Sequence, residues 1–212
     1  MTVNQPIEDR TDPLTGTTAI VTGVSRGFGR AIATALAEAG AHVVGVARGS
    51  AQLEELHDAL GDSFSPVTAD AADPDVANRL IDQHRPRTLV LCAGASPTMS
   101  PLQDQTWESF SQTWDVDVAQ AFHWSRHALR RPLAPGSRLP RLTRATQLGA
   151  KAVAAYAGRQ GVDVETFVKA DGPSLTAEQV GRSVVELAAG RHRDHGSYLL
   201  TAAGLSALAA NN

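Results

Sequence analysis

The sequence is poor in several features on which particular protein classes depend. One cysteine among 212 residues excludes an internal disulfide and fits a reducing compartment, so we expect a cytoplasmic protein. No apolar run reaches the ~18 residues that a membrane span needs, and the polar first residues lack the apolar centre of a secretion signal. A net charge of −3 shows no basic excess, so we expect neither nucleic acid nor a membrane surface as partner.

What the sequence does have is a regular alternation of strand and helix patterns. Strands are predicted at 17–23, 42–48, 64–70 and 88–94, with helices at 27–41, 50–61 and 73–84 between them and a long helical region from Gln105 to Leu133. Pro66 suits a strand at the edge of the sheet. This order predicts an open parallel sheet covered on both faces by helices. Residues 1–16 are polar and are expected to form a flexible arm before a single domain, 17–212.

The chemistry begins in the turn after the first strand, TGVSRGFGR (Thr22–Arg30). Gly23, Gly27 and Gly29 stand between a predicted strand and a predicted helix. Glycine allows a tight turn there and lets backbone N–H groups approach a pyrophosphate at the helix N-terminus. In this context the turn indicates a dinucleotide-binding site.

These residues, with others in the same order, resemble the short-chain dehydrogenase/reductase family. TGVSRGFG resembles its glycine fingerprint, TAD (Thr68–Asp70) its acid after the third strand, and LCAG (Leu91–Gly94) its NNAG motif with both asparagines replaced. The segment around Asp117 resembles a helix that normally carries Asn. The resemblance implies a Rossmann-like, doubly wound, three-layer α/β/α fold and an oxidoreductase of carbonyl/alcohol pairs. The residues it places at the nicotinamide dinucleotide are Gly23, Ser25, Arg26, Gly27, Phe28, Gly29, Arg48, Asp70, Ala71, Cys92, Ala93 and Gly94.

Charge at the end of the second strand selects between the two nicotinamide nucleotides. NAD-preferring sites hold Asp or Glu there for the ribose hydroxyls, and a 2′-phosphate would be repelled. This chain has Ala47 followed by Arg48, and Arg26 adds a second guanidinium in the glycine loop. Arginine is a permanently charged, forked partner for phosphate. We therefore expect NADP(H) rather than NAD(H).

The catalytic residues that the resemblance implies are not in this sequence. The family uses Ser, Tyr and Lys, the last two spaced as YxxxK. Here the two tyrosines, Tyr156 and Tyr198, are followed four positions later by Gln160 and Ala202. Lys151 precedes Tyr156, and Lys169 stands apart from both tyrosines. No catalytic residue is assigned on this pattern.

The alternation breaks between Pro135 and Arg144. The resemblance implies that Arg138 and Leu139 join two loops directly, so that the fifth strand, the catalytic helix and the sixth strand are missing. A natural loss, an error in the assigned gene and an engineered deletion would look the same in the sequence. Without those strands, the last one, GSYLLTAAG (196–204), either lies beside the fourth or leaves both edges open. Open apolar edges favour association, so we expect a homo-oligomer.

Other polar groups have simpler interpretations. His123 and His127 lie four residues apart without a third ligand, so no metal site is assigned. The histidine-containing loop 190–196 is interpreted as a solvated connector. Cys92 has no neighbour in sequence that would lower its pKa. Asp117 is either a lone acid facing the cofactor pocket or a carboxylate on the helix surface.

Three functional hypotheses follow. In the first, the chain is an NADP-dependent oxidoreductase that acts on a small carbonyl or alcohol, and the missing residues leave it impaired or inactive. Alternatively it is a non-catalytic nucleotide-binding or regulatory protein on the same fold. The third possibility is a truncation product with an incomplete sheet that survives by association.

Overall fold

A computed structural model describes residues 12–96, 98, 100–131, 158, 161–166, 175–192 and 197–208. All residues predicted to contact the nucleotide lie within these ranges. The predicted junction between Arg138 and Leu139 lies outside the described residues, as do Lys151, Tyr156 and Lys169. Predictions that fall on those positions therefore stay predictions.

A parallel sheet forms the centre of the described structure. Its strands are β1 (Thr18–Thr22), β2 (His42–Ala47), β3 (Phe64–Thr68) and β4 (Thr88–Val90), in the order β3-β2-β1-β4. β1 pairs with β2 from Thr18↔His42 to Thr22↔Val46. The crossover order and parallel pairing confirm the predicted Rossmann-like sheet. β3 lies at one edge, where Pro66 costs no internal ladder bond.

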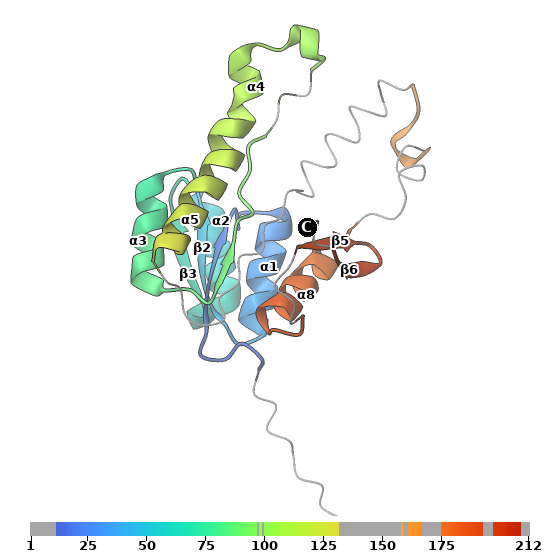
Figure 1. The fold of residues 1–212 in the computed structure, drawn as a ribbon. Helices are drawn as coiled ribbons and strands as arrows, with labels where there is room; N and C mark the ends of the chain where they lie inside the picture. Colours follow the sequence, from blue (N-terminus) through green and yellow to red (C-terminus); the bar gives the residue numbers. More distant parts are fainter. Residues whose placement is uncertain are drawn as a thin grey trace, which may run out of the picture.

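Helices cover both faces of this sheet (Figure 1). Their bounds are α1 (Gly27–Glu38), α2 (Ser50–Leu60), α3 (Pro74–His84), α4 (Trp107–Thr113), α5 (Ala119–Arg130) and α8 (Ala177–Ala188). A π-helical turn, η3 (Trp114–Val118), joins α4 to α5. Short 3₁₀ turns are η1 (Gly61–Ser63) and η2 (Leu102–Asp104). The predicted long helix from Gln105 to Leu133 is thus a helical run with one wide turn inside it.

The core is divided into two apolar layers by the sheet. Val43 belongs to the layer under α1, α2 and α8, whereas Val44 belongs to the layer under α3 and α5. This alternation follows from the two-residue period of a strand buried on both faces. Trp124 is the largest fully buried side chain of the second layer, with no exposed surface. The predicted three-layer α/β/α arrangement is confirmed.

Polar side chains cap the first turns of α3 and α8. Asp73 accepts the N–H of Asp75 in front of Pro74, the first residue of α3. Thr176 and Gln179 form a reciprocal capping box at the start of α8. Each arrangement satisfies N–H groups that would otherwise lack a partner in the first turn.

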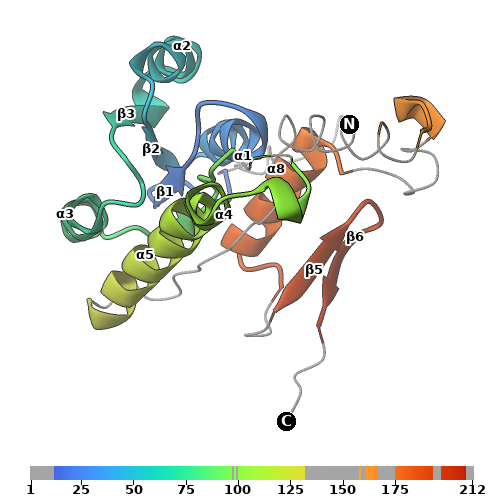
Figure 2. The same ribbon diagram turned by 90° about the horizontal axis from the view of Figure 1, so that it is seen from above.

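Helix α8 lies directly against α1, far from it in sequence (Figure 2). The contact is close because Gly181 presents no side chain: a Cβ there would lie 3.0 Å from the carbonyl oxygen of Ala31 and 3.0 Å from Cβ of Ala35. Val180 and Val184 are buried beside it at 0% and 2% exposure. The C-terminal part of the chain therefore shares the core of the N-terminal part.

Residues 12–16, the first that the structure describes, also pack against the core. Leu14 is 1% exposed within the first core layer, and its N–H donates to the carbonyl of Ala39. Residues 12–16 thus form a turn held against the end of α1. The flexible arm predicted for residues 1–16 can apply only to residues before this turn, and residues 1–11 lie outside the described ranges.

The last predicted strand does not join the parallel sheet. The arrangement in which it lies beside the fourth strand is therefore wrong. β5 (Tyr198–Thr201) pairs antiparallel with β6 (Gly204–Ala207) in a separate two-stranded sheet. The hydroxyl of Thr201 accepts the N–H of Ala203 in the short turn. A hairpin closes a very short loop, so it forms at a lower entropic cost than pairing with a distant strand. In the described residues, β4 keeps an edge without a neighbouring strand.

We expect Gly181→Leu to destabilise the whole protein by about 1–3 kcal/mol, because the side chain has to force α8 away from α1. Thermal unfolding followed by circular dichroism and by tryptophan fluorescence measures the effect. Arg182→Leu adds the same side chain at an exposed position and should change stability little. A second, separate unfolding transition in the wild type would contradict the prediction that residues 17–212 form a single domain.

Candidate functional site

A cavity of about 770 Å³ opens at the carboxyl ends of β1, β2 and β4. Parallel α/β sheets bind ligands at this edge, and the volume lies in the range of small-molecule sites. All twelve residues predicted at the nucleotide line this one cavity. They come from four separate stretches of the chain: the turn before α1, the end of β2, the turn after β3 and the loop after β4. The structure therefore brings together residues that the sequence analysis selected separately.

The glycine turn is required by close packing on two sides. Gly23 has φ +74°, and a Cβ there would lie 2.6 Å from the backbone nitrogen of Ala93 in the loop after β4. A Cβ on Gly29 would lie 2.2 Å from the carbonyl oxygen of Gly23. Any larger residue would therefore move α1 or the β4 loop, and with them the floor of the cavity. The first turn of α1 receives no side-chain cap from Arg26, the residue at its N-cap.

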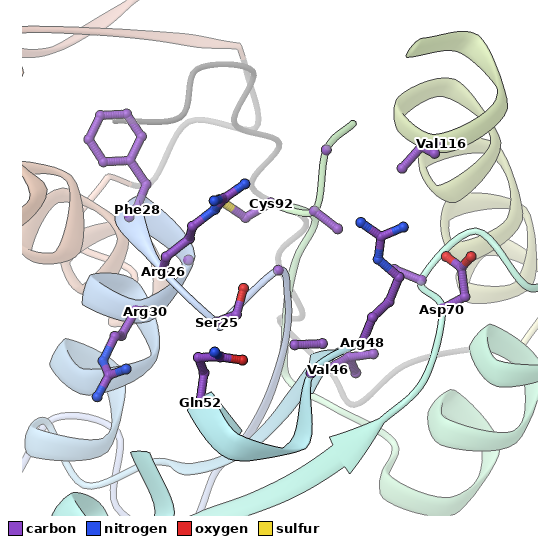
Figure 3. Close-up of a pocket in the computed structure, with 18 of the residues that line it drawn as sticks. Ser25, Arg26, Phe28, Arg30, Val46, Arg48, Gln52, Asp70, Cys92 and Val116 are labelled. Carbon is purple, nitrogen blue, oxygen red and sulfur yellow. The ribbon is translucent and has the colours of Figure 1, made fainter. Parts of the chain in front are cut away.

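Three arginines line the cavity, and two of them extend into it from different elements. Figure 3 shows Arg26, from the glycine turn, and Arg48, from the end of β2, both extending into the space. Arg30 turns away and forms an ion pair with Glu55, 3.3 Å between guanidinium and carboxylate. That pairing offsets the negative charge of Glu55, which also lines the cavity. An anionic ligand would thus meet two guanidinium groups on entering.

The turn after β3 is held in place by local hydrogen bonds. One carboxylate oxygen of Asp70 accepts the N–H of Ala72 at 2.9 Å. The carbonyl of Ala71 accepts the indole N–H of Trp124 from α5 at 2.8 Å. Because Trp124 is fully buried, this bond fixes the turn relative to the core.

The loop after β4 is fixed by a buried polar network that the sequence analysis missed. Thr22, at the end of β1, accepts the N–H groups of Cys92 at 3.0 Å and Ala93 at 3.1 Å, and its hydroxyl bonds to the amide oxygen of Gln120 at 2.9 Å. The amide nitrogen of Gln120 donates to the carbonyl of Ala93. Thr22 and Gln120 are 0% and 3% exposed. Only one sequence feature could have indicated Gln120: it is a polar residue on the buried side of a predicted helix.

Asp117 lies neither in the cavity lining nor simply on the helix surface, the two positions considered from sequence. Its Oδ1 accepts the N–H of Ala95 at 2.7 Å, so the carboxylate of η3 holds the same β4 loop from outside the cavity. Partial burial raises the pKa of Asp117 above its ordinary value, and the hydrogen bond from Ala95 opposes that shift.

The environment of Cys92 is not that of a reactive thiol. Burial raises its pKa to about 11, so the sulfur is protonated at neutral pH and is a weak nucleophile. Its side chain lines the cavity as a small apolar group.

The remaining candidates have structural contacts. His127 pairs with Asp82 of α3 at 3.0 Å, and His123 lies beside the ring of Phe122. In the described part of the loop 190–196, His192 lies 3.7 Å from Glu186 and stacks edge-on against Tyr198. Among the described residues, no group of three or more His, Cys, Asp or Glu side chains could hold a metal ion.

The cavity also has lining residues that the motifs did not indicate. Most lie next to the predicted ones on the same strands and turns, whereas two come from α2 and one from η3. They are Arg30, Val46, Ala47, Gly49, Gln52, Glu55, Ala69, Ala95 and Val116.

Comparison with known sequences agrees with this geometry. The sequence profile of the short chain dehydrogenase family matches residues 17–137, which is more than half of the chain and contains every predicted nucleotide contact. The chain belongs to the short-chain dehydrogenase family. The resemblance deduced from the glycine turn and the later motifs is thereby confirmed.

Individual relatives in this family are matched over part of their length. D-erythrulose reductase of Gallus gallus is 33% identical over 122 residues, 57% of this chain and 49% of the relative. L-xylulose reductase of Mesocricetus auratus is 31% identical over 124 residues, 58% and 50% of the two chains. Versicolorin reductase of Emericella nidulans is 32% identical over 167 residues, 74% and 62%. The chain spans about half the length of the first two of these relatives.

A solved structure shows the same fold. A putative NAD(P)-dependent gluconate 5-dehydrogenase from Beutenbergia cavernae, with NADP bound at low occupancy, superposes with a TM-score of 0.67 at 24% identity. The superposition covers 84% of this chain and 92% of the other. Within the described residues, none of the helices is both long and apolar enough to cross a membrane.

We expect Asp117→Asn to stabilise this short-chain dehydrogenase at neutral pH. The amide oxygen can still accept the N–H of Ala95, and the penalty of a partly buried charge is removed. A pKa raised in the folded state means that the carboxylate destabilises above that pKa and that this effect fades as the pH falls through it. The advantage of Asn, measured by urea unfolding across the acid range, should therefore shrink as the pH falls. Asp117→Ala, which loses the bond, should be less stable than Asp117→Asn throughout.

Proposed function

We propose that this member of the short-chain dehydrogenase family binds NADP(H) in the cavity at the ends of β1, β2 and β4. The observation that carries the proposal is the convergence of all twelve predicted residues, Arg26 and Arg48 among them, on one cavity. The second strand ends in Ala47 and Arg48, without the acid that would repel a 2′-phosphate.

The residues present fit such a nucleotide. Gly23 and Gly29 leave room for backbone to approach a pyrophosphate, and each would clash if it carried a Cβ. Arg48 would hold the 2′-phosphate with Arg26 beside it, and Asp70 and Ala71 would border the adenine. Cys92, Ala93 and Gly94 would line the nicotinamide side. When bound, the nicotinamide ring donates or accepts a hydride.

Several relatives are named for the same nucleotide. A probable NADP-dependent dehydrogenase of Haemophilus influenzae is 47% identical over 57 residues, and a carbonyl reductase [NADPH] of Sus scrofa is 29% identical over 149 residues. The solved structure from Beutenbergia cavernae contains NADP. These names support NADP(H) over NAD(H) as the ligand of this chain.

We expect NADPH to bind at least tenfold more tightly than NADH, because a charge-assisted contact to phosphate contributes about 1.5–3 kcal/mol. Isothermal titration calorimetry with both nucleotides measures the ratio. Arg48→Ala should weaken NADPH binding and leave NADH nearly unchanged, which brings the ratio close to one.

Two further variants complete this experiment. Arg79→Ala removes the same charge from an exposed position on α3, away from the cavity, and should leave both affinities unchanged. Gly29→Val should abolish binding of both nucleotides, since its side chain meets the Gly23 carbonyl. Tighter binding of NADH by the wild type would overturn the role given to Arg48.

We also propose that this sequence is impaired in catalysing carbonyl reduction. The sequence holds no YxxxK, and the family match ends at residue 137, next to the predicted junction at Arg138–Leu139. Reduction of a carbonyl needs a proton donor and a partner for the developing oxyanion. Loss of general acid catalysis lowers a rate by about 10²–10⁴, and loss of the oxyanion partner adds a comparable factor. In the described site, the Asp117 carboxylate accepts a hydrogen bond from Ala95 and has no proton to donate once ionised.

We therefore expect no steady NADPH consumption with a panel of ketones, aldehydes and quinones. The controls are Tyr156→Phe and Asp117→Asn, assayed in parallel with the wild type. Steady turnover by the wild type that either variant abolishes would show that a different acid serves this site.

The alternative function is a non-catalytic nucleotide binder or regulator. A cavity lined by all twelve residues predicted at the nucleotide, in a sequence without YxxxK, favours this candidate. Nucleotide binding without turnover, together with a changed conformation or partner affinity in the bound state, would distinguish it from an impaired enzyme. Absence of nucleotide binding would favour a truncation product. Small carbonyl or alcohol substrates and a cytoplasmic location stay predictions.

A further inference from the structure

Helix α5 sends two buried polar side chains to different ends of the cavity. The amide nitrogen of Gln120 donates to the carbonyl of Ala93 in the loop after β4. The indole N–H of Trp124 donates to the carbonyl of Ala71 in the turn after β3, at 2.8 Å. We call residues 91–95 the β4 loop and residues 69–72 the β3 turn. In the proposed nucleotide site, the β4 loop borders the nicotinamide and the β3 turn borders the adenine.

Neither of these side chains lines the cavity. Gln120 and Trp124 are 3% and 0% exposed, on the inner side of α5, whereas Ala71 and Ala93, which accept their hydrogen bonds, do line the cavity. Burial of an amide or an indole N–H costs free energy unless the group is hydrogen-bonded. The two residues therefore act on a ligand only through the backbone that they hold.

The sheet does not join the two segments directly. β3 and β4 lie at opposite ends of the described order β3-β2-β1-β4, with two strands between them. In the view of Figure 3, Asp70 and Cys92 lie apart, with Arg48 between them. Helix α5 reaches both segments because it packs across one face of the sheet, where Trp124 belongs to the same core layer as Val44 of β2.

The helix fixes the two hydrogen-bonding positions relative to each other. Gln120 and Trp124 are four residues apart, so they share one face and are separated by about 6 Å along the helix axis. Gln120 is also tied to the end of β1, since its amide oxygen accepts the hydroxyl of Thr22 at 2.9 Å. A site held by a helix is more precise than one held by loops alone. The β4 loop and the β3 turn are thus kept in one relative position.

A dinucleotide contacts both segments at once, so their separation affects its affinity. Loops that become ordered only on binding lower the affinity, and a site that is already arranged for the ligand avoids that cost. Two hydrogen bonds from one helix provide this arrangement within the protein itself.

We propose that Gln120 and Trp124 are positioning residues through which α5 holds the β4 loop and the β3 turn at the separation that one NADP(H) molecule spans. The inference rests on the proposed nucleotide site. It assigns a different half of the nucleotide to each residue: Gln120 governs the nicotinamide half and Trp124 governs the adenine half.

Gln120→Met tests the nicotinamide half, because it keeps the length of the side chain and removes both hydrogen bonds. NADPH should bind about three- to tenfold more weakly, since the bond from Ala95 to Asp117 still holds the β4 loop. The fluorescence anisotropy of the bound reduced nicotinamide should fall. The affinity for 2′,5′-ADP, which lacks the nicotinamide, should stay unchanged. Gln120→Leu serves if Gln120→Met does not fold.

Replacing Trp124 with benzothienylalanine tests the adenine half, because sulfur takes the place of the indole N–H and the shape is otherwise kept. The affinities for 2′,5′-ADP and for NADPH should both fall about three- to tenfold. The nicotinamide anisotropy of the bound NADPH should stay at its wild-type value. The same replacement at Trp107, 77% exposed on α4, should change none of these quantities.

Ala128→Gly controls for a loss of stability alone. Ala128 lies on the same inner face of α5, 6% exposed, and its methyl group makes no hydrogen bond. The variant should unfold more easily and should keep both affinities and the anisotropy. Amide hydrogen exchange in the nucleotide-free protein gives a second reading: Gln120→Met should speed exchange at Cys92 and Ala93 more than in the rest of the sheet, whereas Ala128→Gly should not.

The outcomes separate this inference from the proposed function. Equal losses of affinity for NADPH and 2′,5′-ADP in Gln120→Met, or the same pattern of changes in Ala128→Gly, would overturn the positioning roles while the nucleotide site stands. A wild type that binds neither NADPH nor 2′,5′-ADP would overturn the proposed nucleotide site, and this inference with it.

Discussion

The hydroxyl of Thr22 is the contact on which the cavity depends. A hydroxyl has one donor and two acceptor positions, and here all three are used: it donates to Gln120 and accepts the N–H groups of Cys92 and Ala93. This one buried atom therefore joins the end of β1, the loop after β4 and the start of α5. Because an unsatisfied buried polar group is costly, none of the three elements can shift without breaking the arrangement.

The network also explains how the β4 loop is held in place although its sequence departs from the family pattern. The motif around Leu91 and Cys92 lacks the two asparagines that the resemblance implies, so no side-chain amide comes from the loop itself. Gln120 supplies an amide from α5 instead, and Asp117 adds a bond to Ala95 from η3. The wide turn of η3 lies between α4 and these anchoring residues. Sites where a helix carries a π-helical turn are often functional, and here the turn carries a residue that positions the cavity wall.

The two halves of the sequence contribute unequally to the structure. The part up to the end of α5 provides the parallel sheet, the second core layer, most of the first and the cavity lining, whereas α8 completes the layer over α1. The helical run after β4 is covered on the side that faces the sheet and α3. A sequence without a YxxxK motif still forms the cavity, because the residues that line it lie in other parts of the chain.

The sequence by itself determined the order of strands and helices, the parallel sheet and twelve of the residues that line the cavity. These follow from local signals: apolar runs of strand length, the glycine turn of Gly23–Gly29, and motifs that lie directly after strands, whose carboxyl ends meet at one edge. Only the tertiary structure decided that Gln120 reaches Thr22 across 98 positions, that Asp117 bonds the β4 loop rather than facing the cavity, and that β5 pairs with β6. Such contacts depend on the relative placement of elements and on which side of a helix faces the sheet. Residue type and spacing limit which of these contacts can form. Packing and the satisfaction of buried polar groups decide which of them do form.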